Sequence, residues 1–265
     1  MSQRNNQDAK QSAKQNARER MRAERERQQR AATVRRKITI GAISLAVVVV
    51  AAGVSVALAG NGGSSGPLVL PANSSGTDGT VIVYGNPASK NVLDVYEDLR
   101  CPICDELEKT DGTTIQQLAD NGTYVIHYHM ATFLDSRLGG SGSHNALAAA
   151  GAALNESPAM FKKFHDVLYA NQPAEENDGF ASTSHLLALA AQVPGLVTPD
   201  FTKAVKDGTY KPWVDKVTDA FNNSGVSGTP TLKLNGKQLT VFDGQGTPIS
   251  STQYTQLIQQ TVSAN

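Results

Sequence analysis

Cysteine is scarce in this chain, which has only Cys101 and Cys104 among its 265 residues. Small secreted domains that depend on disulfides for stability carry several cysteine pairs, so the sequence excludes that class of protein. The formal net charge of the chain is zero, but basic residues are concentrated near the N-terminus. Residues 1–37 hold 12 of the 24 Lys and Arg and only 4 of the 24 Asp and Glu. This uneven distribution indicates that the chain is divided into parts with different surroundings.

The basic segment 1–37 lacks aromatic residues and has almost no apolar face. It cannot pack a hydrophobic core, so we expect a disordered tail or a fluctuating helix that is attracted to anionic lipid. The same positive charge would suit nucleic acid. Without aromatic residues or a folded module, however, no nucleic-acid partner is expected.

Residues 38–59 lack any charged residue. About 20 apolar residues at 1.5 Å per residue cross a hydrocarbon core of roughly 30 Å, so this segment predicts a single transmembrane helix. The basic residues 35–37 precede it, which places the N-terminus in the cytoplasm and the remainder outside. The alternative is a cleaved signal peptide, because Ala57 and Ala59 have the spacing of a cleavage site. Both the charged and the apolar segments are long for a signal peptide, which favours the anchor.

Beyond the apolar segment, Gly, Ser, Asn and Pro dominate residues 60–79, which predicts a flexible linker. The folded domain is expected over residues 80–265. Short apolar runs bounded by turn residues predict strands at 80–84, 91–96, 124–129, 231–234 and 238–242, with a hairpin turn at Asn235-Gly236 between the last two. Helical periodicity predicts helices at 101–119, at five places between about 143 and 224, and at 252–262.

The order of these elements predicts the fold class. Two strands, a helix and a strand come first, a helical block follows, and two strands and a helix end the chain. Without the block, this is a small α/β protein with a mixed sheet. We therefore predict a thioredoxin-like fold with a helical insertion at about 136–224, preceded by a single transmembrane helix.

The motif CPIC, residues 101–104, allows three interpretations. A disulfide between residues three apart closes a very small loop, so it contributes little as a structural device. A zinc site would need two further ligands, for which His127 and His129 on one strand face are candidates, but no second CxxC is present. The third interpretation is a redox-reactive pair, since a strand and a short loop lead to a CxxC that opens a helix.

The redox interpretation follows from the position of Cys101 at a helix N-terminus. Free backbone N–H groups and the helix dipole favour an anion there, so the pKa of the thiol is expected to be low. The thiolate is the species that attacks in exchange, and Cys104, one turn further, is close enough to resolve a mixed disulfide. Pro102 suits the first helical position, where its missing N–H is not needed.

The stretch from Glu97 to Cys104 (EDLRCPIC) resembles the active-site segment of DsbA-like thiol-disulfide oxidoreductases, particularly membrane-tethered ones of actinobacterial type. Two other parts match this family. The segment 227–231 (SGTPT) resembles its cis-proline loop, and 133–135 (FLD) resembles the entry into its helical insertion. The resemblance covers about residues 80–265.

The resemblance implies roles for particular residues. Cys101 and Cys104 would be the catalytic pair, and Thr229 and Pro230 would bind the partner chain. An X–Pro bond is the one peptide bond that adopts cis at little cost, and a cis bond here would leave the Thr229 backbone free to pair with an extended peptide. The alternative is an ordinary trans proline at the start of an edge strand. Further active-site neighbours are expected to be Pro102, Ile103, Glu97 and Asp98.

The sequence also departs from the family. Its relatives often carry a buried acid six residues before the first cysteine, and this chain has Val95 there. Asp94, Glu97 and Asp98 lie near that place. Between the cysteines no histidine is present to stabilise the Cys101 thiolate. Arg100 is expected to favour the thiolate, whereas the nearby acidic side chains of Asp98, Asp105 and Glu106 oppose it.

We therefore expect a membrane-anchored, extracytoplasmic thiol-disulfide oxidoreductase that oxidises cysteines of secreted or surface proteins. The compartment favours oxidation because disulfides are made outside the cytoplasm. The resemblance implies reoxidation by a membrane partner of the DsbB or VKOR type, and no cofactor or metal is expected. The alternatives are a reductase or isomerase of the same fold, or a binding module without catalytic turnover.

Overall fold

The computed structural model describes residues 66–263, so the predicted tail (1–37) and transmembrane helix (38–59) lie outside the described residues. None of the helices within 66–263 is long and apolar enough to cross a membrane. The strands of the described part form one sheet in the order β1-β2-β4-β3-β5-β6. Their bounds are β1 Ser74–Ser75, β2 Val81–Tyr84, β3 Val92–Asp98, β4 Val125–Ala131, β5 Thr231–Leu234 and β6 Lys237–Gln238.

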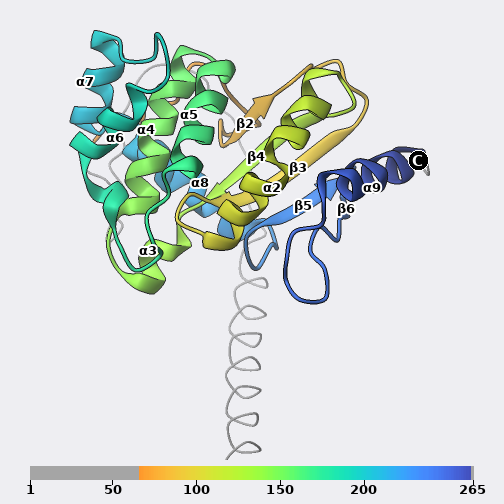
Figure 1. Ribbon diagram of the computed structural model, residues 1–265. Helices are drawn as coiled ribbons and strands as arrows, with labels where there is room; N and C mark the ends of the chain where they lie inside the picture. Colours follow the sequence, from red (N-terminus) through yellow and green to blue (C-terminus); the bar gives the residue numbers. More distant parts are fainter. Residues whose placement is uncertain (1–65, 264–265) are drawn as a thin grey trace, which may run out of the picture. The chain divides into compact units, whose positions relative to one another are not determined.

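Helices separate and flank these strands. In chain order they are α2 Pro102–Asp120, α3 Phe133–Leu138, α4 Gly142–Glu156, α5 Pro158–Ala170, the short 3-10 helix η1 Gly179–Ala181, α6 Thr183–Ala190, α7 Pro199–Asp207, α8 Lys211–Asn223 and α9 Ser251–Ser263. Helices α3 to α8 form the insertion between β4 and β5. Figure 1 shows α4 to α7 grouped together beside the sheet, with α9 at its other end.

The central strand β3 leads to the candidate site, and its pairing determines which other elements end beside that site. It runs parallel to β4 and antiparallel to β5. The carboxyl ends of β3 and β4 therefore meet at one edge of the sheet, where β3 leads to α2 and β4 leads to the insertion. Helix α2 packs against α5 and α9 on one face of the sheet. Apolar side chains of α2 that enter this core are Leu107, Ile115 and Ala119.

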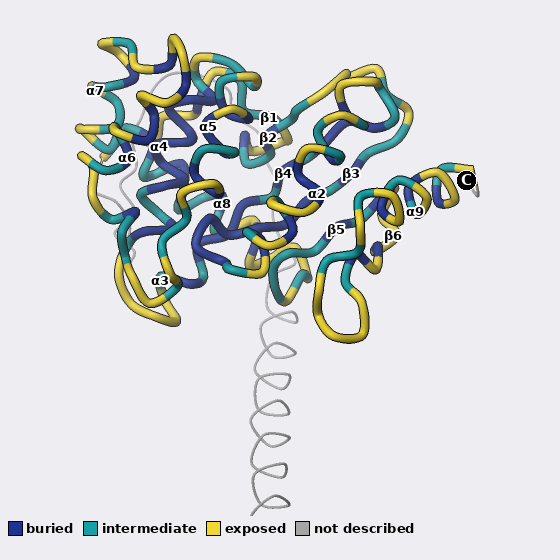
Figure 2. Tube along the Cα trace, in the orientation of Figure 1, coloured by how far each residue is buried: buried dark blue, intermediate teal, exposed yellow. Residues whose placement is uncertain are grey.

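The insertion is built around α4, in which 11 of the 15 residues are buried, most of them Ala or other small residues (Figure 2). Small side chains let the neighbouring helices approach closely. A Cβ at Gly151 would lie 2.8 Å from a ring carbon of Trp213 on α8, so the helix needs glycine there. The indole Nε1 of Trp213 donates to the Gly79 carbonyl at 2.7 Å, which attaches the insertion to the segment before β2.

The segment before β2 differs from the expected linker. Within the predicted linker 60–79, Ser74–Ser75 pairs with β2, and Asn73 Nδ2 donates to the carbonyl of Leu154 at 2.8 Å. The edge of β2 offers free backbone groups to a partner strand, and the last turn of α4 offers free carbonyls. The folded domain therefore begins before residue 80.

The strand expected at 238–242 is also different. The Asn235-Gly236 turn forms with both residues at positive φ, as a two-residue hairpin requires, but β6 ends at Gln238. Val241 and Asp243 then bond to Ile249 and Thr247, so this part of the chain makes its own small turn. Leu239 and Val241 are buried, which explains the apolar alternation that suggested a strand.

Candidate active site

Cys101 occupies the N-cap position of α2, directly after the carboxyl end of β3. Its backbone N–H donates to the Asp98 carbonyl at 2.9 Å, and its Sγ accepts from the backbone N–H of Cys104 at 3.4 Å. Pro102 takes the first helical position, as expected. The sulfur of Cys101 therefore takes the place of the side-chain oxygen that usually caps a helix.

The loop before β5 lies against Cys101. The peptide bond between Thr229 and Pro230 is cis, as predicted. The carbonyl oxygen of Thr229 lies 3.6 Å from Cys101 Sγ, although the two residues are 128 positions apart. Ile103, between the two cysteines, has 41% of its surface exposed. The structure thus brings together residues 101–104 and 229–230, the catalytic pair and the cis-proline loop that the resemblance implied.

The two cysteines are free thiols with different surroundings. A hydrogen bond from the Cys104 thiol lowers the pKa of Cys101 to about 7, helped by backbone N–H groups of the helix terminus and opposed by burial. Burial and the neighbouring Cys101 raise the pKa of Cys104 well above its usual value. At neutral pH, Cys101 is therefore ready to react as a thiolate while Cys104 remains a thiol.

Both cysteines are enclosed. Although Cys101 stands at the start of a helix, only 5% of its surface is exposed, and Cys104 has none exposed. Gln172, which follows α5, contributes to this enclosure because its Nε2 donates to the carbonyls of Leu99 and Cys101 at 2.9 and 3.1 Å. No motif in the sequence pointed to Gln172.

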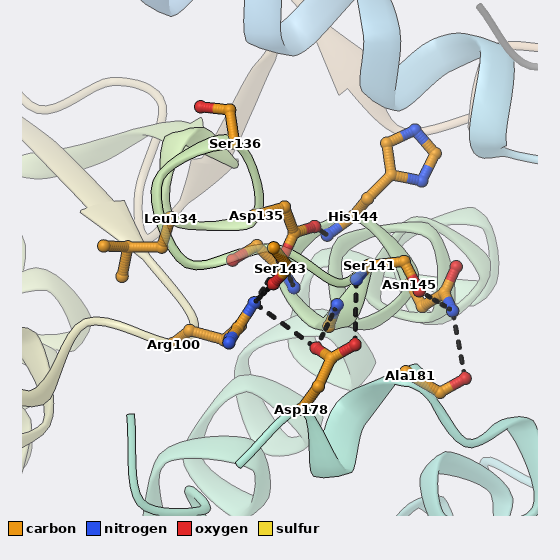
Figure 3. Close-up of polar contacts among 12 residues, drawn as sticks. Arg100, Leu134, Asp135, Ser136, Ser141, Ser143, His144, Asn145, Asp178 and Ala181 are labelled. Atoms are coloured by element: carbon orange, nitrogen blue, oxygen red, sulfur yellow. Dashed lines mark hydrogen bonds and ion pairs between the residues drawn. The ribbon is translucent and has the colours of Figure 1, made fainter. Parts of the chain in front are cut away.

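Arg100 pairs with two carboxylates, although its position next to Cys101 suggested that it would stabilise the thiolate. Its Nη1 lies 2.7 Å from Asp135 Oδ1 and 3.3 Å from Asp178 Oδ1 (Figure 3). The two carboxylates also accept backbone N–H groups at the start of α4, with Asp135 accepting from Ser143 and His144. The guanidinium is buried and anchors the active-site loop to the insertion.

Asp98 is fully buried at the end of β3. Its Oδ1 accepts from Ser143 Oγ at 2.6 Å and from the Arg100 backbone N–H at 3.0 Å, and its Oδ2 accepts from the Leu134 N–H at 3.2 Å. Burial raises the pKa of Asp98 to about 6, and these hydrogen bonds moderate the increase. Asp98 thus fixes the loop that carries Cys101.

Glu97 lies on the face of β3 opposite to Asp98, and Val95 lies on the same face as Glu97. Val95 occupies the position at which relatives carry the buried acid. Glu97 is buried, and its Oε1 lies 2.5 Å from Nε2 of His165 on α5. Burial lowers the pKa of His165, but the charge of Glu97 and hydrogen bonds to Asp166 and Glu97 outweigh it and raise this pKa to about 10. No pattern in the sequence indicated this pairing.

His127 and His129 lie on the other face of the sheet from Glu97. Nε2 of His129 is 2.8 Å from Asp94 Oδ1, and its ring stacks on Tyr96. His127 Nδ1 is 3.9 Å from the same carboxylate oxygen. The structure therefore groups the two histidines with Asp94 and not with the cysteines, so they do not complete a zinc site with the CxxC motif.

Comparison with known proteins identifies the fold. A family model described as thioredoxin matches residues 77–260. The chain belongs to this thioredoxin family. Among curated proteins, the thioredoxin-family chain is 27% identical over 149 residues to Disulfide bond formation protein D of Bacillus subtilis (strain 168). That match covers 56% of this chain and 64% of the relative, so the chain spans somewhat less than two thirds of it.

Solved structures place this thioredoxin-family protein among DsbA-like neighbours. The reduced form of the disulfide bond oxidoreductase DsbG from Mycobacterium tuberculosis is 27% identical, with a TM-score of 0.56, over 69% of this chain and 86% of that one. MdbA, a thiol-disulfide oxidoreductase from Actinomyces oris, gives the same four values. The predicted DsbA-like thioredoxin fold with a helical insertion is confirmed, including its actinobacterial relatives.

The low pKa of Cys101 leads to a prediction for stability. A thiol whose pKa is lower in the folded state stabilises the fold above its unfolded pKa of ~8.5, and this contribution disappears as the pH falls through the folded pKa. The free energy of unfolding of the reduced domain, relative to Cys101→Ser, is therefore expected to fall by about 2 kcal/mol from pH 9 to pH 6. Urea unfolding followed by fluorescence of Trp213, the single Trp, measures it. A constant difference across this range would contradict the assignment of the thiolate.

Proposed function

We propose that this chain is an extracytoplasmic protein thiol-disulfide oxidoreductase that oxidises cysteines of secreted or cell-surface proteins. The observation that carries the proposal is the asymmetry of its two cysteines beside the cis-proline loop. Cys101 has a pKa of about 7 and contacts Thr229, whereas the neutral Cys104 lies behind it. Membership of the thioredoxin family and DsbA-like neighbours support the same reaction.

The proposed reaction uses the two sulfurs in sequence. A substrate thiolate attacks Cys101 of the oxidised enzyme, the Cys101–Cys104 bond breaks, and Cys104 leaves. The second substrate thiolate then attacks the mixed disulfide, so that substrate leaves with a disulfide and Cys101 leaves as a thiolate. In this scheme Thr229 and Pro230 hold the substrate chain, and the exposed Ile103 contacts it next to the sulfur.

The proposal includes the location and the partners. The apolar segment 38–59 would anchor the protein in the membrane with residues 1–37 in the cytoplasm, so that the described domain works outside. A membrane protein of the DsbB or VKOR type would reoxidise the Cys101–Cys104 pair. No nucleic-acid partner, metal or cofactor belongs to this scheme.

A second candidate function is reduction or isomerisation of disulfides. The observation in its favour is also the pKa of Cys101, because about 7 is the value of a reducing thioredoxin and lies above that of the strongest oxidants. A non-catalytic binding module is a third possibility, but a module of that kind has no need for an activated thiol.

A redox titration tests whether the protein oxidises or reduces its substrates. We expect the potential of the Cys101–Cys104 pair, measured against glutathione, to lie between the ~−120 mV of DsbA and the ~−270 mV of thioredoxin. The reduced form is expected to resist denaturant better than the oxidised form, because a stabilised thiolate makes the pair oxidising. A potential at or below −270 mV, with the oxidised form the more stable, would support the reductase. Absence of any exchange with glutathione would leave only the binding module.

A further inference from the structure

The end of α5 and the residues that follow it lie against the active-site loop. Tyr169 Oη donates to the Asp98 carbonyl at 3.3 Å. Gln172 Nε2 donates to the carbonyls of Leu99 and Cys101 at 2.9 and 3.1 Å. Three successive bends of the loop therefore receive donors from a segment about 70 positions further along the chain.

Gln172 is the residue of this segment that reaches Cys101 itself. An amide group has two donor hydrogens, and the carbonyls of Leu99 and Cys101 use both. The Cys101 carbonyl also accepts the backbone N–H of Asp105 at 3.1 Å, and the Cys101 N–H donates to the Asp98 carbonyl at 2.9 Å. The backbone of the nucleophile is thus held on both sides, by its own turn before it and by α2 and Gln172 after it.

This hold on the backbone determines where the sulfur of Cys101 lies. Cys101 has the extended conformation of an N-cap residue, with φ −73° and ψ 116°. In this conformation its Sγ accepts from the N–H of Cys104 at 3.4 Å. Rotation about ψ would turn the Cys101 carbonyl away from both Gln172 and Asp105. The two donors therefore oppose any movement that takes the sulfur out of its place at the helix start.

The position of Gln172 is itself fixed by the insertion. Helix α5 ends at Ala170, and the Gln172 N–H donates back to the Tyr169 carbonyl at 3.2 Å. Three residues later, the carbonyl of Glu175 accepts from Arg100 Nη2 at 3.1 Å. Gln172 thus stands between two attached points, so its side chain does not have to be ordered when Cys101 reacts.

Ionisable groups around the loop are either neutral or already bonded. Cys104 and Tyr169 are neutral at pH 7, because burial raises their pKa values well above the usual ones. Arg100 pairs with carboxylates of the insertion, and Asp105 pairs with a lysine one turn further along α2. The carboxylate of Asp98 accepts three hydrogen bonds. The placement of neutral donors at the helix start therefore matters for the charge on the sulfur.

We propose that Gln172 is a positioning residue for the nucleophile: it holds the Cys101 carbonyl so that the sulfur stays at the start of α2, in the orientation in which it takes part in exchange. The inference rests on the proposed thiol-disulfide exchange and adds a residue of the insertion to it. Gln172 acts through the backbone of Cys101.

Two substitutions test this role. Gln172→Met removes both donors with little change in length, and Gln172→Glu keeps the shape but turns a negative charge toward the loop. The ultraviolet absorbance of the thiolate, titrated in the reduced protein against a Cys101→Ser background, measures the pKa of Cys101. Gln172→Glu is expected to raise this pKa by about one unit, the lower end of the effect of a nearby charge. Gln172→Met is expected to raise it by less, because only the positioning is lost.

The pH dependence of the reaction gives a second readout. Reduced protein is mixed with an aromatic disulfide that releases a coloured thiol when Cys101 attacks it. In Gln172→Glu the rate is expected to fall about threefold at pH 6, because a tenfold smaller thiolate fraction is partly offset by the greater nucleophilicity of a more basic thiolate. At pH 9, where the thiolate predominates in both proteins, the variant is expected to react about twofold faster than wild type.

Asn171 provides the matched control. It is the exposed neighbour of Gln172, and its Nδ2 donates to the Val167 carbonyl of its own helix at 2.8 Å. Asn171→Asp adds the same charge one residue away, and Asn171→Met removes the same kind of amide. Both should titrate as wild type, since a charge in open solvent is screened.

A higher pKa in both Gln172 variants, together with the reversed order of rates between pH 6 and pH 9, would support the positioning role. An unchanged titration in the two variants would overturn it, and so would an equal shift in Asn171→Asp and Gln172→Glu, which would indicate charge without positioning. A slower reaction by the same factor at every pH would also overturn it, since that result indicates a general disturbance of the fold. If Gln172→Met folds poorly by circular dichroism, Gln172→Glu and Asn171→Asp decide by themselves. If wild-type protein attacks no disulfide while the titrations still shift, the proposed function fails and the positioning of Cys101 stands.

Discussion

Cys104→Ser is expected to convert the protein into a covalent trap for its substrates. Cys101 still forms a thiolate and attacks a disulfide, but the resolving thiol is missing, so the mixed disulfide persists. Cys101→Ser is expected to reduce exchange to the uncatalysed rate, because the buried Cys104 keeps its proton at neutral pH. Non-reducing electrophoresis with a disulfide-bonded peptide measures the trapped species, and peptide oxidation by the disulfide form of wild type gives the reference rate.

The assignment of the two sulfurs has a direct control. Limited alkylation of the reduced protein at pH 6 should label Cys101 far ahead of Cys104, since only the former has a pKa near 7. Labelling of Cys104 first would reverse the roles. A trap formed equally by the two serine variants would show that the asymmetry has no chemical consequence.

Arg100→Met is expected to destabilise the domain by about 3 kcal/mol, the lower end of the range for breaking a buried ion pair. The change leaves Asp135 and Asp178 without their shared guanidinium and leaves the carbonyls of Gly139 and Glu175 without a donor. Backbone N–H groups at the start of α4 still pair with both carboxylates, which keeps the loss from being larger. Urea unfolding at neutral pH measures the free energy.

Arg137→Met is the matched control for this prediction. Arg137 is exposed and lies 4.8 Å above the ring of Phe133, an arrangement that contributes about 0.5–1 kcal/mol at surface sites. A loss in Arg100→Met no larger than that in Arg137→Met would mean that the buried network does not hold the active-site loop in place.

Local sequence was enough to predict much of the fold. Prolines at the starts of α7 and α8 and the Asn235-Gly236 turn act on the residues next to them, so their consequences are visible without tertiary context. The same holds for Cys101 at a helix start. The expected strand at 238–242 was wrong because buried apolar residues alternate there for another reason, a small turn with its own core contacts.

The contacts between the active-site segment 97–101 and the insertion could not be predicted in the same way. His165 lies 68 positions after Glu97, and Gln172 lies 71 positions after Cys101. Neither His165 nor Gln172 belongs to a motif or a periodic pattern, since each reaches the active-site segment only through the folding of the insertion. Arg100 was misassigned for a related reason. Its sequence neighbour is Cys101, but Asp135, 35 positions away, offers a charged partner in a buried place.

Every residue from Glu97 to Cys101 is bonded to the inserted segment, through His165, Ser143, Gln172 and Asp135. The end of β3 and the insertion should therefore unfold locally as one cooperative unit. In hydrogen exchange, amides of this short segment would follow the protection of α4 and α5 and not that of the β5–β6 hairpin. The inserted helices are therefore part of what gives the active-site loop its shape, and not an accessory to a core that is complete without them.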